Sequence, residues 1–183
     1  MPVEFLTSEQ ESQYGKYNAN PTADQLAKYF LLDDQDRTII FRHRGNHNWL
    51  GYAIQLGTVR FLGTFITDIS EVPVCVVDYM SNQLNINIKD LHRLIDARNL
   101  WLHTQEIRNI YGYSDFSDQP GHFKLTRWLY AKAWIAEERP SILFDFATSK
   151  CVEQKILLPG VSVMARLIAQ VRDRANIRLW NIL

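Results

Sequence analysis

Apolar side chains recur every three or four residues through most of the chain, the spacing that places them on one face of an α-helix. Helix-start signals precede these runs. Thr7 and Thr22 are each followed three residues later by a glutamine, as in a capping box, and Asp33 can cap a third helix. The pattern predicts an all-α fold.

A longer helix is predicted over about 46–63. Leu50 begins a series of apolar residues at helical spacing, whereas Tyr52 and Val59 lie on the opposite side of the same helix. A helix that is apolar on two faces is expected to be buried between neighbours. Gly57 in its interior costs about 1 kcal/mol relative to alanine, which indicates close packing at that position.

The polar segment 67–73, which ends in a proline, is the clearest boundary in the sequence. It predicts two small helical lobes, 1–67 and 72–183, with helix-turn-helix-like elements. The helices expected after it cover 74–84, a short stretch from Asn87 through Ile95, 98–111, 122–138, 141–157 and 162–183. The last reaches Leu183 without a stop signal, so the second lobe is expected to be cut short at its C-terminal end.

The composition is that of a globular protein, with 46% hydrophobic and 22% charged residues. Cys75 and Cys151 lie in apolar surroundings and are expected to be reduced, buried thiols. The sequence has neither the basic start of a signal peptide nor an apolar run long enough to span a membrane. These features predict a soluble, cytoplasmic protein.

Basic and acidic residues balance at 20 each, but their distribution along the chain is uneven. No acidic residue lies between Arg37 and Thr67. Guanidinium groups can bridge a phosphate or pair with guanine, and amides can pair with adenine. This segment therefore predicts a helix-turn-helix contact with DNA, the alternative being a solvated basic surface. The candidate residues are Arg42, Arg44, Asn46, His47, Asn48 and Arg60.

A second acid-free segment, 119–136, places Lys124 and Arg127 three residues apart on a predicted helix. Both are candidates for supporting contacts with phosphate. The interleaved aromatic residues have helical spacing and are expected in the core rather than stacked on bases: Phe123, Trp128, Tyr130 and Trp134.

Metal binding and catalysis find little support in the sequence. His43 and His47 are four residues apart, but no cysteine pair or nearby carboxylate completes a tetrahedral set. The acidic residues do not single out a trio that could hold two metal ions, and motifs for phosphate binding or nucleophilic catalysis are missing. We therefore predict no metal site, no cofactor and no enzymatic activity in this chain.

Several stretches together resemble the beginning of Tn-three-type replicative transposases, in order and at similar spacing. They cover 1–7, 29–34, 47–65, 110–116, 127–131, 138–145 and 157–167, and so extend over essentially the whole chain. The resemblance implies that this is the N-terminal, DNA-binding part of a bacterial transposase, and that its partner is the terminal inverted repeat of a transposon. It also implies that an Asp-Asp-Glu catalytic domain with magnesium lies in the missing remainder of the protein.

Other functions remain open at this point. The helices could form an assembly module that docks on the remainder of the transposase without specific DNA binding. A metal-dependent nuclease and a stand-alone helix-turn-helix repressor are further alternatives. The full-length protein could also form a homodimer.

Overall fold

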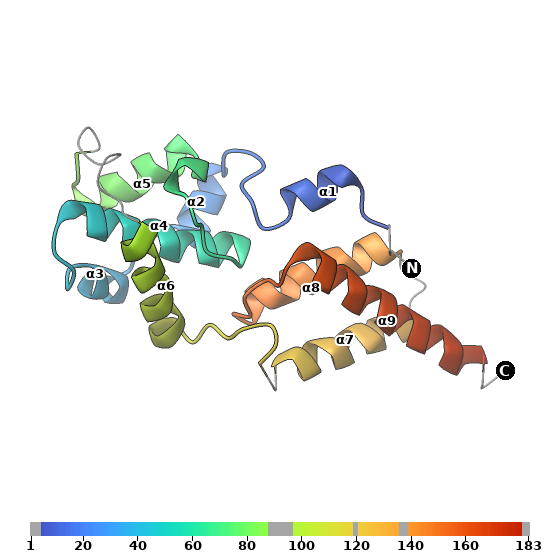
Figure 1. The fold of residues 1–183 in the computed structure, drawn as a ribbon. Coiled ribbons are helices and arrows are strands. Elements are labelled where there is room, and N and C mark those ends of the chain that lie inside the picture. The colour runs from blue at the N-terminus through green and yellow to red at the C-terminus, as the bar shows by residue number, and fades with distance from the viewer. Residues whose placement is uncertain (1–4, 88–96, 119–120, 136–138, 181–183) are drawn as a thin grey trace. The chain divides into compact units, whose positions relative to one another are not determined.

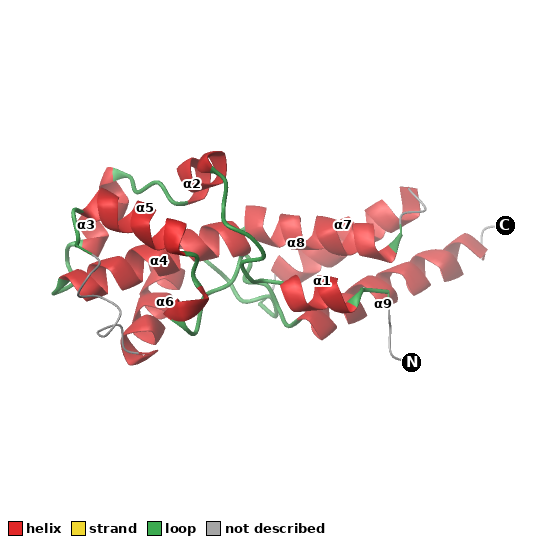
Figure 2. Cartoon of the chain, turned by 90° about the horizontal axis from the view of Figure 1, so that it is seen from above, coloured by secondary structure: helices red, strands yellow, loops and turns green. Residues whose placement is uncertain are grey.

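The computed structural model describes residues 5–87, 97–118, 121–135 and 139–180. Within these ranges every regular element is helical, so the all-α prediction is confirmed (Figures 1 and 2). The short helix predicted through Ile95 lies outside the described residues. The elements are α1 (Ser8–Gln13), α2 (Ala23–Tyr29), α3 (Asp34–Ile40), α4 (Asn46–Leu62), the 3₁₀-helix η1 (Ile69–Glu71), α5 (Val74–Leu84), α6 (Ala97–Tyr111), α7 (Gly121–Ile135), α8 (Pro140–Glu153) and α9 (Val161–Trp180).

Local sequence signals explain where the first three helices begin. Thr7, Thr22 and Asp33 each accept a hydrogen bond from the backbone N–H three residues later. The side chain at that later position accepts one from the N-cap backbone in return, which completes a capping box at each helix. Each box satisfies two backbone donors that helix geometry leaves unpaired, so these predictions are confirmed.

The chain forms two units, which we describe separately. The α4 unit is Tyr17–Tyr113, and in it α4 packs against α2, α3, α5 and α6 (Figure 1). Every residue of α4 from Leu50 to Val59 is buried. The expectation that this helix is covered on more than one side is confirmed.

Buried polar groups of α4 are hydrogen-bonded, as burial requires. The amide of Gln55 donates to the carbonyl of Ile66 at 2.8 Å and accepts from the Ile66 N–H at 3.2 Å. The hydroxyl of Thr58 lies 2.6 Å from the Tyr17 hydroxyl. These contacts fasten the segment after α4 and the segment before α2 to the central helix.

The α9 unit consists of Met1–Lys16 with Ser114–Leu183. Its helices α7, α8 and α9 pack against one another around a core that includes Leu129, Phe144, Met164 and Ile168. Tyr14, which follows α1, lies with its ring 5.1 Å from that of Phe144. The buried positions of α9 include Met164, Leu167, Val171 and Ala175, which follow one another at helical spacing.

The structure divides the chain at positions other than the predicted 67–72. α4 needs α5 and α6 to cover it, so the first unit extends to Tyr113. The polar segment predicted as a boundary contains η1 and lies within that unit.

Two burial predictions also change. Cys75 is half-buried rather than buried, and Phe123 is 62% exposed rather than in the core. Among the described residues, no helix is long and apolar enough to cross a membrane.

Gly57 is a position in α4 where an added side chain would collide with its surroundings. An added Cβ atom would lie 2.4 Å from Cδ1 of Phe30 and 2.6 Å from Cε of Met80, both fully buried. We expect Gly57→Ala to lower the free energy of unfolding by about 1 kcal/mol or more, because overpacking outweighs the better helix propensity of alanine.

Urea unfolding measures this change, with Gly160→Ala as the control. A Cβ atom at Gly160 would meet nothing within 4 Å, so the control is expected to change stability less. A Gly57→Ala protein as stable as the parent would show that α4 does not pack as closely as described.

Candidate nucleic-acid interface

The turn between α3 and α4, residues 41–45, ends at a glycine with an unusual backbone. Gly45 has φ 90° and ψ 143° and forms the N-cap of α4. Its carbonyl accepts hydrogen bonds from the N–H groups of Asn48 and Trp49 at 3.0 and 3.2 Å. A Cβ atom here would lie 2.8 Å from Cε1 of His47, so both backbone and space favour glycine. Gly45 thereby sets the direction in which the chain enters α4.

Side chains from the first turn of α4 fold back on this turn and fix it. The indole N–H of Trp49 donates to the carbonyl of His43 at 2.7 Å, and the amide of Asn48 donates to the carbonyl of Arg44 at 2.8 Å. The Trp49 ring also meets Phe41 edge-on at 4.9 Å. The turn is therefore held by several contacts.

Five of the eight predicted contact residues come together here. Arg42, Arg44 and Asn46 are exposed, whereas His47 and Asn48 are half-buried. We name residues 41–48 the basic turn. Because the surrounding acid-free segment supplies no carboxylate along the chain, the two guanidinium groups give this surface positive charge.

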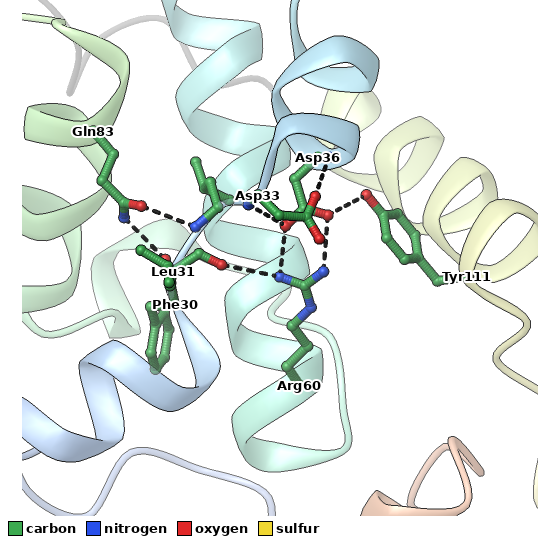
Figure 3. Close-up of polar contacts among 8 residues, drawn as sticks. Phe30, Leu31, Asp33, Asp36, Arg60, Gln83 and Tyr111 are labelled. Atoms are coloured by element: carbon green, nitrogen blue, oxygen red, sulfur yellow. Dashed lines mark hydrogen bonds and ion pairs between the residues drawn. The ribbon is translucent and has the colours of Figure 1, made fainter.

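Arg60 lies at the other end of α4, about 20 Å from Asn46 at the rise of an α-helix. Figure 3 shows its guanidinium facing Asp36 of α3, with N–O distances of 2.8 and 2.9 Å. Asp36 is 1% exposed, and Tyr111 of α6 donates to it at 2.7 Å. Burial by itself lowers the pKa of Arg60, but the hydrogen bonds and charge of Asp36 raise it above its usual value. Arg60 thus joins α3, α4 and α6, and we leave it out of the interface.

The remaining two predicted residues lie in the α9 unit. Lys124 and Arg127 are both exposed on α7, at positions that share one side of the helix. They do not belong to the unit that carries the basic turn.

The burial of α4 changes the helix-turn-helix interpretation. A helix that reads DNA needs one face free to enter the major groove. Leu50–Val59 are buried all round, so α4 offers no such face beyond its first turn. The structure retains the turn of the predicted motif but does not leave α4 available as its recognition helix.

Beneath the basic turn lies an aromatic cluster that the sequence did not indicate. The ring of His43 lies 4.9 Å from that of Tyr52 and 5.2 Å from that of His103 on α6. Nε2 of His43 is 3.1 Å from a carboxylate oxygen of Glu106, also on α6. Burial, with smaller contributions from His43 and His47, lowers the pKa of His103 to about 4. The cluster places α6 directly against the basic turn.

Metal binding has no geometric support in the described part of the chain. Within it, no group of three or more histidine, cysteine, aspartate or glutamate side chains could hold a metal ion. His43, His47 and Glu106 therefore do not form a three-ligand metal site.

The described residues define an all-helical protein with an exposed turn rich in arginine and amide groups. Residues 5–171 match the family described as "Domain of unknown function (DUF4158)". This match covers most of the chain, and the protein belongs to that family.

Among curated proteins the chain is similar to transposases. It is 48% identical over 182 residues to the transposase for transposon gamma-delta of Escherichia coli (strain K12), covering 98% of this chain and 18% of that protein. It is 27% identical to the transposase for transposon Tn1546 of Enterococcus faecium, over 97% of the chain and 18% of the relative. The chain thus spans less than a fifth of the length of these relatives. The resemblance to Tn-three-type transposases is confirmed.

The carboxylate of Asp36 should couple α3, α4 and α6 energetically. We expect Asp36→Asn to lower the free energy of unfolding by about 3 kcal/mol, since it removes the partner of a partly buried charge. Tyr111→Phe removes one hydrogen bond to that carboxylate and should cost about 1.5 kcal/mol or more. Urea unfolding of both single variants and the double variant checks this. Effects that simply add would contradict a shared network, which predicts a double-variant loss smaller than the sum.

The burial of His103 predicts a pH-dependent stability. Its pKa is about 4 in the folded protein and about 6.5 when unfolded, so between these values the unfolded chain binds more protons. Stability from this residue is fully present above pH 6.5 and is lost progressively as the pH falls toward 4. The predicted loss is on the order of 3 kcal/mol.

Unfolding free energies of the parent and of His103→Leu, measured across pH 4–7.5, isolate this contribution. The difference between the two proteins should vary with pH in that window. A constant difference would contradict the burial of a neutral His103 beside His43, His47 and Glu106.

Proposed function

We propose that this chain binds double-stranded DNA and recognises the terminal inverted repeats of a transposon. The observation that carries the proposal is the exposure of Arg42, Arg44 and Asn46 on one rigid turn within an acid-free segment. The similarity to transposases supports it, because those proteins act on transposons according to their names.

The two arginines suit contacts with the DNA backbone. A guanidinium donates two parallel hydrogen bonds to a phosphate, and its charge displaces counterions from the duplex. The net charge of the chain is zero, so attraction to DNA depends on where the charges gather. Contacts of this kind orient the protein on the duplex, and side chains reaching base edges supply the sequence preference.

The amides of the basic turn contribute unequally under this proposal. Asn46 is exposed and available to DNA, whereas Asn48 already donates to the Arg44 carbonyl. Asn48 therefore acts mainly by holding Arg44 in place. Lys124 and Arg127 on α7 would add phosphate contacts from the α9 unit.

We further propose that the chain contributes binding and not strand cleavage. The transposases it resembles are more than five times longer than the matched region, since the chain covers 18% of the first two. The cutting chemistry of such a protein, with its magnesium ions, would lie outside this chain.

A second candidate function is an assembly module that docks on the remainder of a transposase. Exposed apolar side chains of the α9 unit favour it: Phe123 on α7 is 62% exposed, and Val163 and Ile177 on α9 are 46% and 61% exposed. This alternative predicts no salt-dependent binding of DNA by the isolated chain.

Fluorescence anisotropy with the repeat from the ends of this protein's own transposon, and with a scrambled duplex, distinguishes these functions. Tighter binding to the repeat, weakening as salt rises, supports the proposal. Equal, weak binding to both duplexes would contradict sequence recognition, and no binding would favour the assembly module.

Charge removal on the basic turn should weaken DNA binding without regard to sequence. We expect Arg42→Ala and Arg44→Ala each to lower affinity for both duplexes and to reduce the slope of log affinity against log salt by about 1. Lys28→Ala removes the same charge from an exposed position on α2 and is the matched control. If the control lowers affinity as much as the two arginine variants, the turn has no special role.

A further inference from the structure

Helix α6 has one buried and one outward side. Leu100, His103 and Ile107 are buried at helical spacing and face the α4 unit's interior. Trp101, Gln105 and Asn109 follow at steps of four residues and lie together on the other side. We name these three residues the outer face of α6.

The exposure of this outer face is unusual for its residue types. Trp101 is 60% exposed, Asn109 is exposed and Gln105 is half-buried. Tryptophan is one of the most highly buried residues on average, so an exposed one on a helix calls for a partner. The adjacent Leu102 is also 49% exposed.

The side chains of the outer face suit the edges of base pairs. Asparagine and glutamine can pair with the N6 and N7 positions of adenine, and apolar groups contact the methyl group of thymine. The sequence of α6 contains one acidic residue, Glu106, and this carboxylate lies 3.1 Å from His43. This carboxylate therefore lies against the basic turn and not on the outer face.

The same contact places α6 beside positive charge. His43 belongs to the basic turn, so Glu106 brings one side of α6 against the segment that exposes Arg42 and Arg44. A duplex phosphate backbone held by these arginines would run along the flank of α6. Charge complementarity therefore favours DNA over an apolar protein surface as the partner of this face.

The dimensions agree with a helix in the major groove. Trp101 and Asn109 are eight residues apart, which is about 12 Å along an α-helix. That length spans three to four base pairs, and the major groove of B-DNA, about 12 Å wide, admits an α-helix. The buried α4 cannot take this position, as shown above.

We propose that α6 is the DNA-reading helix of this protein, with Trp101, Gln105 and Asn109 contacting base edges while the basic turn binds phosphate. This inference rests on the proposed DNA binding and assigns its sequence preference to residues 101–109. The basic turn then supplies affinity, and the outer face supplies discrimination.

The test begins by selecting a preferred duplex for the parent chain from a library of random sequences. Affinity for this duplex and for its scrambled version is then measured with Gln105→Ala, Asn109→Ala and the double variant. We expect on the order of 10-fold weaker binding to the selected duplex for each amide lost, and little change for the scrambled duplex. The salt slope should stay at the parent's value, because phosphate contacts are retained.

Asn82→Ala, which removes an exposed amide from α5, is the matched control and should bind as the parent does. Circular dichroism checks that each variant is folded. If Asn109→Ala is not folded, Asn109→Ser, which also removes the amide and adds no charge, tests the same contact. If folded outer-face variants prefer the selected duplex over the scrambled one as strongly as the parent does, the role of α6 is overturned. If Arg44→Ala still weakens binding in that case, the proposal that the basic turn binds DNA stands. A parent chain that selects no duplex would overturn both proposals.

Discussion

The burial of α4 from Leu50 to Val59 is the constraint on which the rest of the α4 unit depends. All ten residues of this stretch are buried, so neighbours must cover it on every side. α2, α3, α5 and α6 supply that cover. Gln55 and Thr58 of α4 also hydrogen-bond Ile66 and Tyr17, which lie in the segments after α4 and before α2. Because the covering helices come from both sides of α4 in sequence, the unit cannot end at the polar segment that follows it.

The same constraint decides which polar groups are available for function. Arg60 lies on α4, and its guanidinium pairs with Asp36, so its charge serves to join three helices. Within the acid-free segment, the arginines that remain exposed are Arg42 and Arg44 of the basic turn, where Gly45 ends the connection from α3. α6 contributes its buried side to the core and is left with an outward side next to that turn. Binding of DNA would therefore use the edge of the unit, with α4 acting as its internal support.

Local structure could be predicted from the sequence because its signals are local. The caps at Thr7, Thr22 and Asp33 involve residues three positions apart, and all three formed as expected. Partnerships between distant residues were not accessible in this way. Arg60 counted as a free charge in an acid-free segment, yet its carboxylate partner is 24 positions earlier in the chain. The spacing of Leu100, His103 and Ile107 was a usable sign that Trp101 lies outward, but it does not reveal that Glu106 meets the basic turn.

Hydrogen exchange of the chain, free and bound to its selected duplex, tests directly whether DNA lies across the basic turn and α6. We expect slower exchange on binding in segments 41–48 and 97–111, with α5 unchanged. Protection that appears elsewhere while these two segments exchange as in the free protein would contradict it.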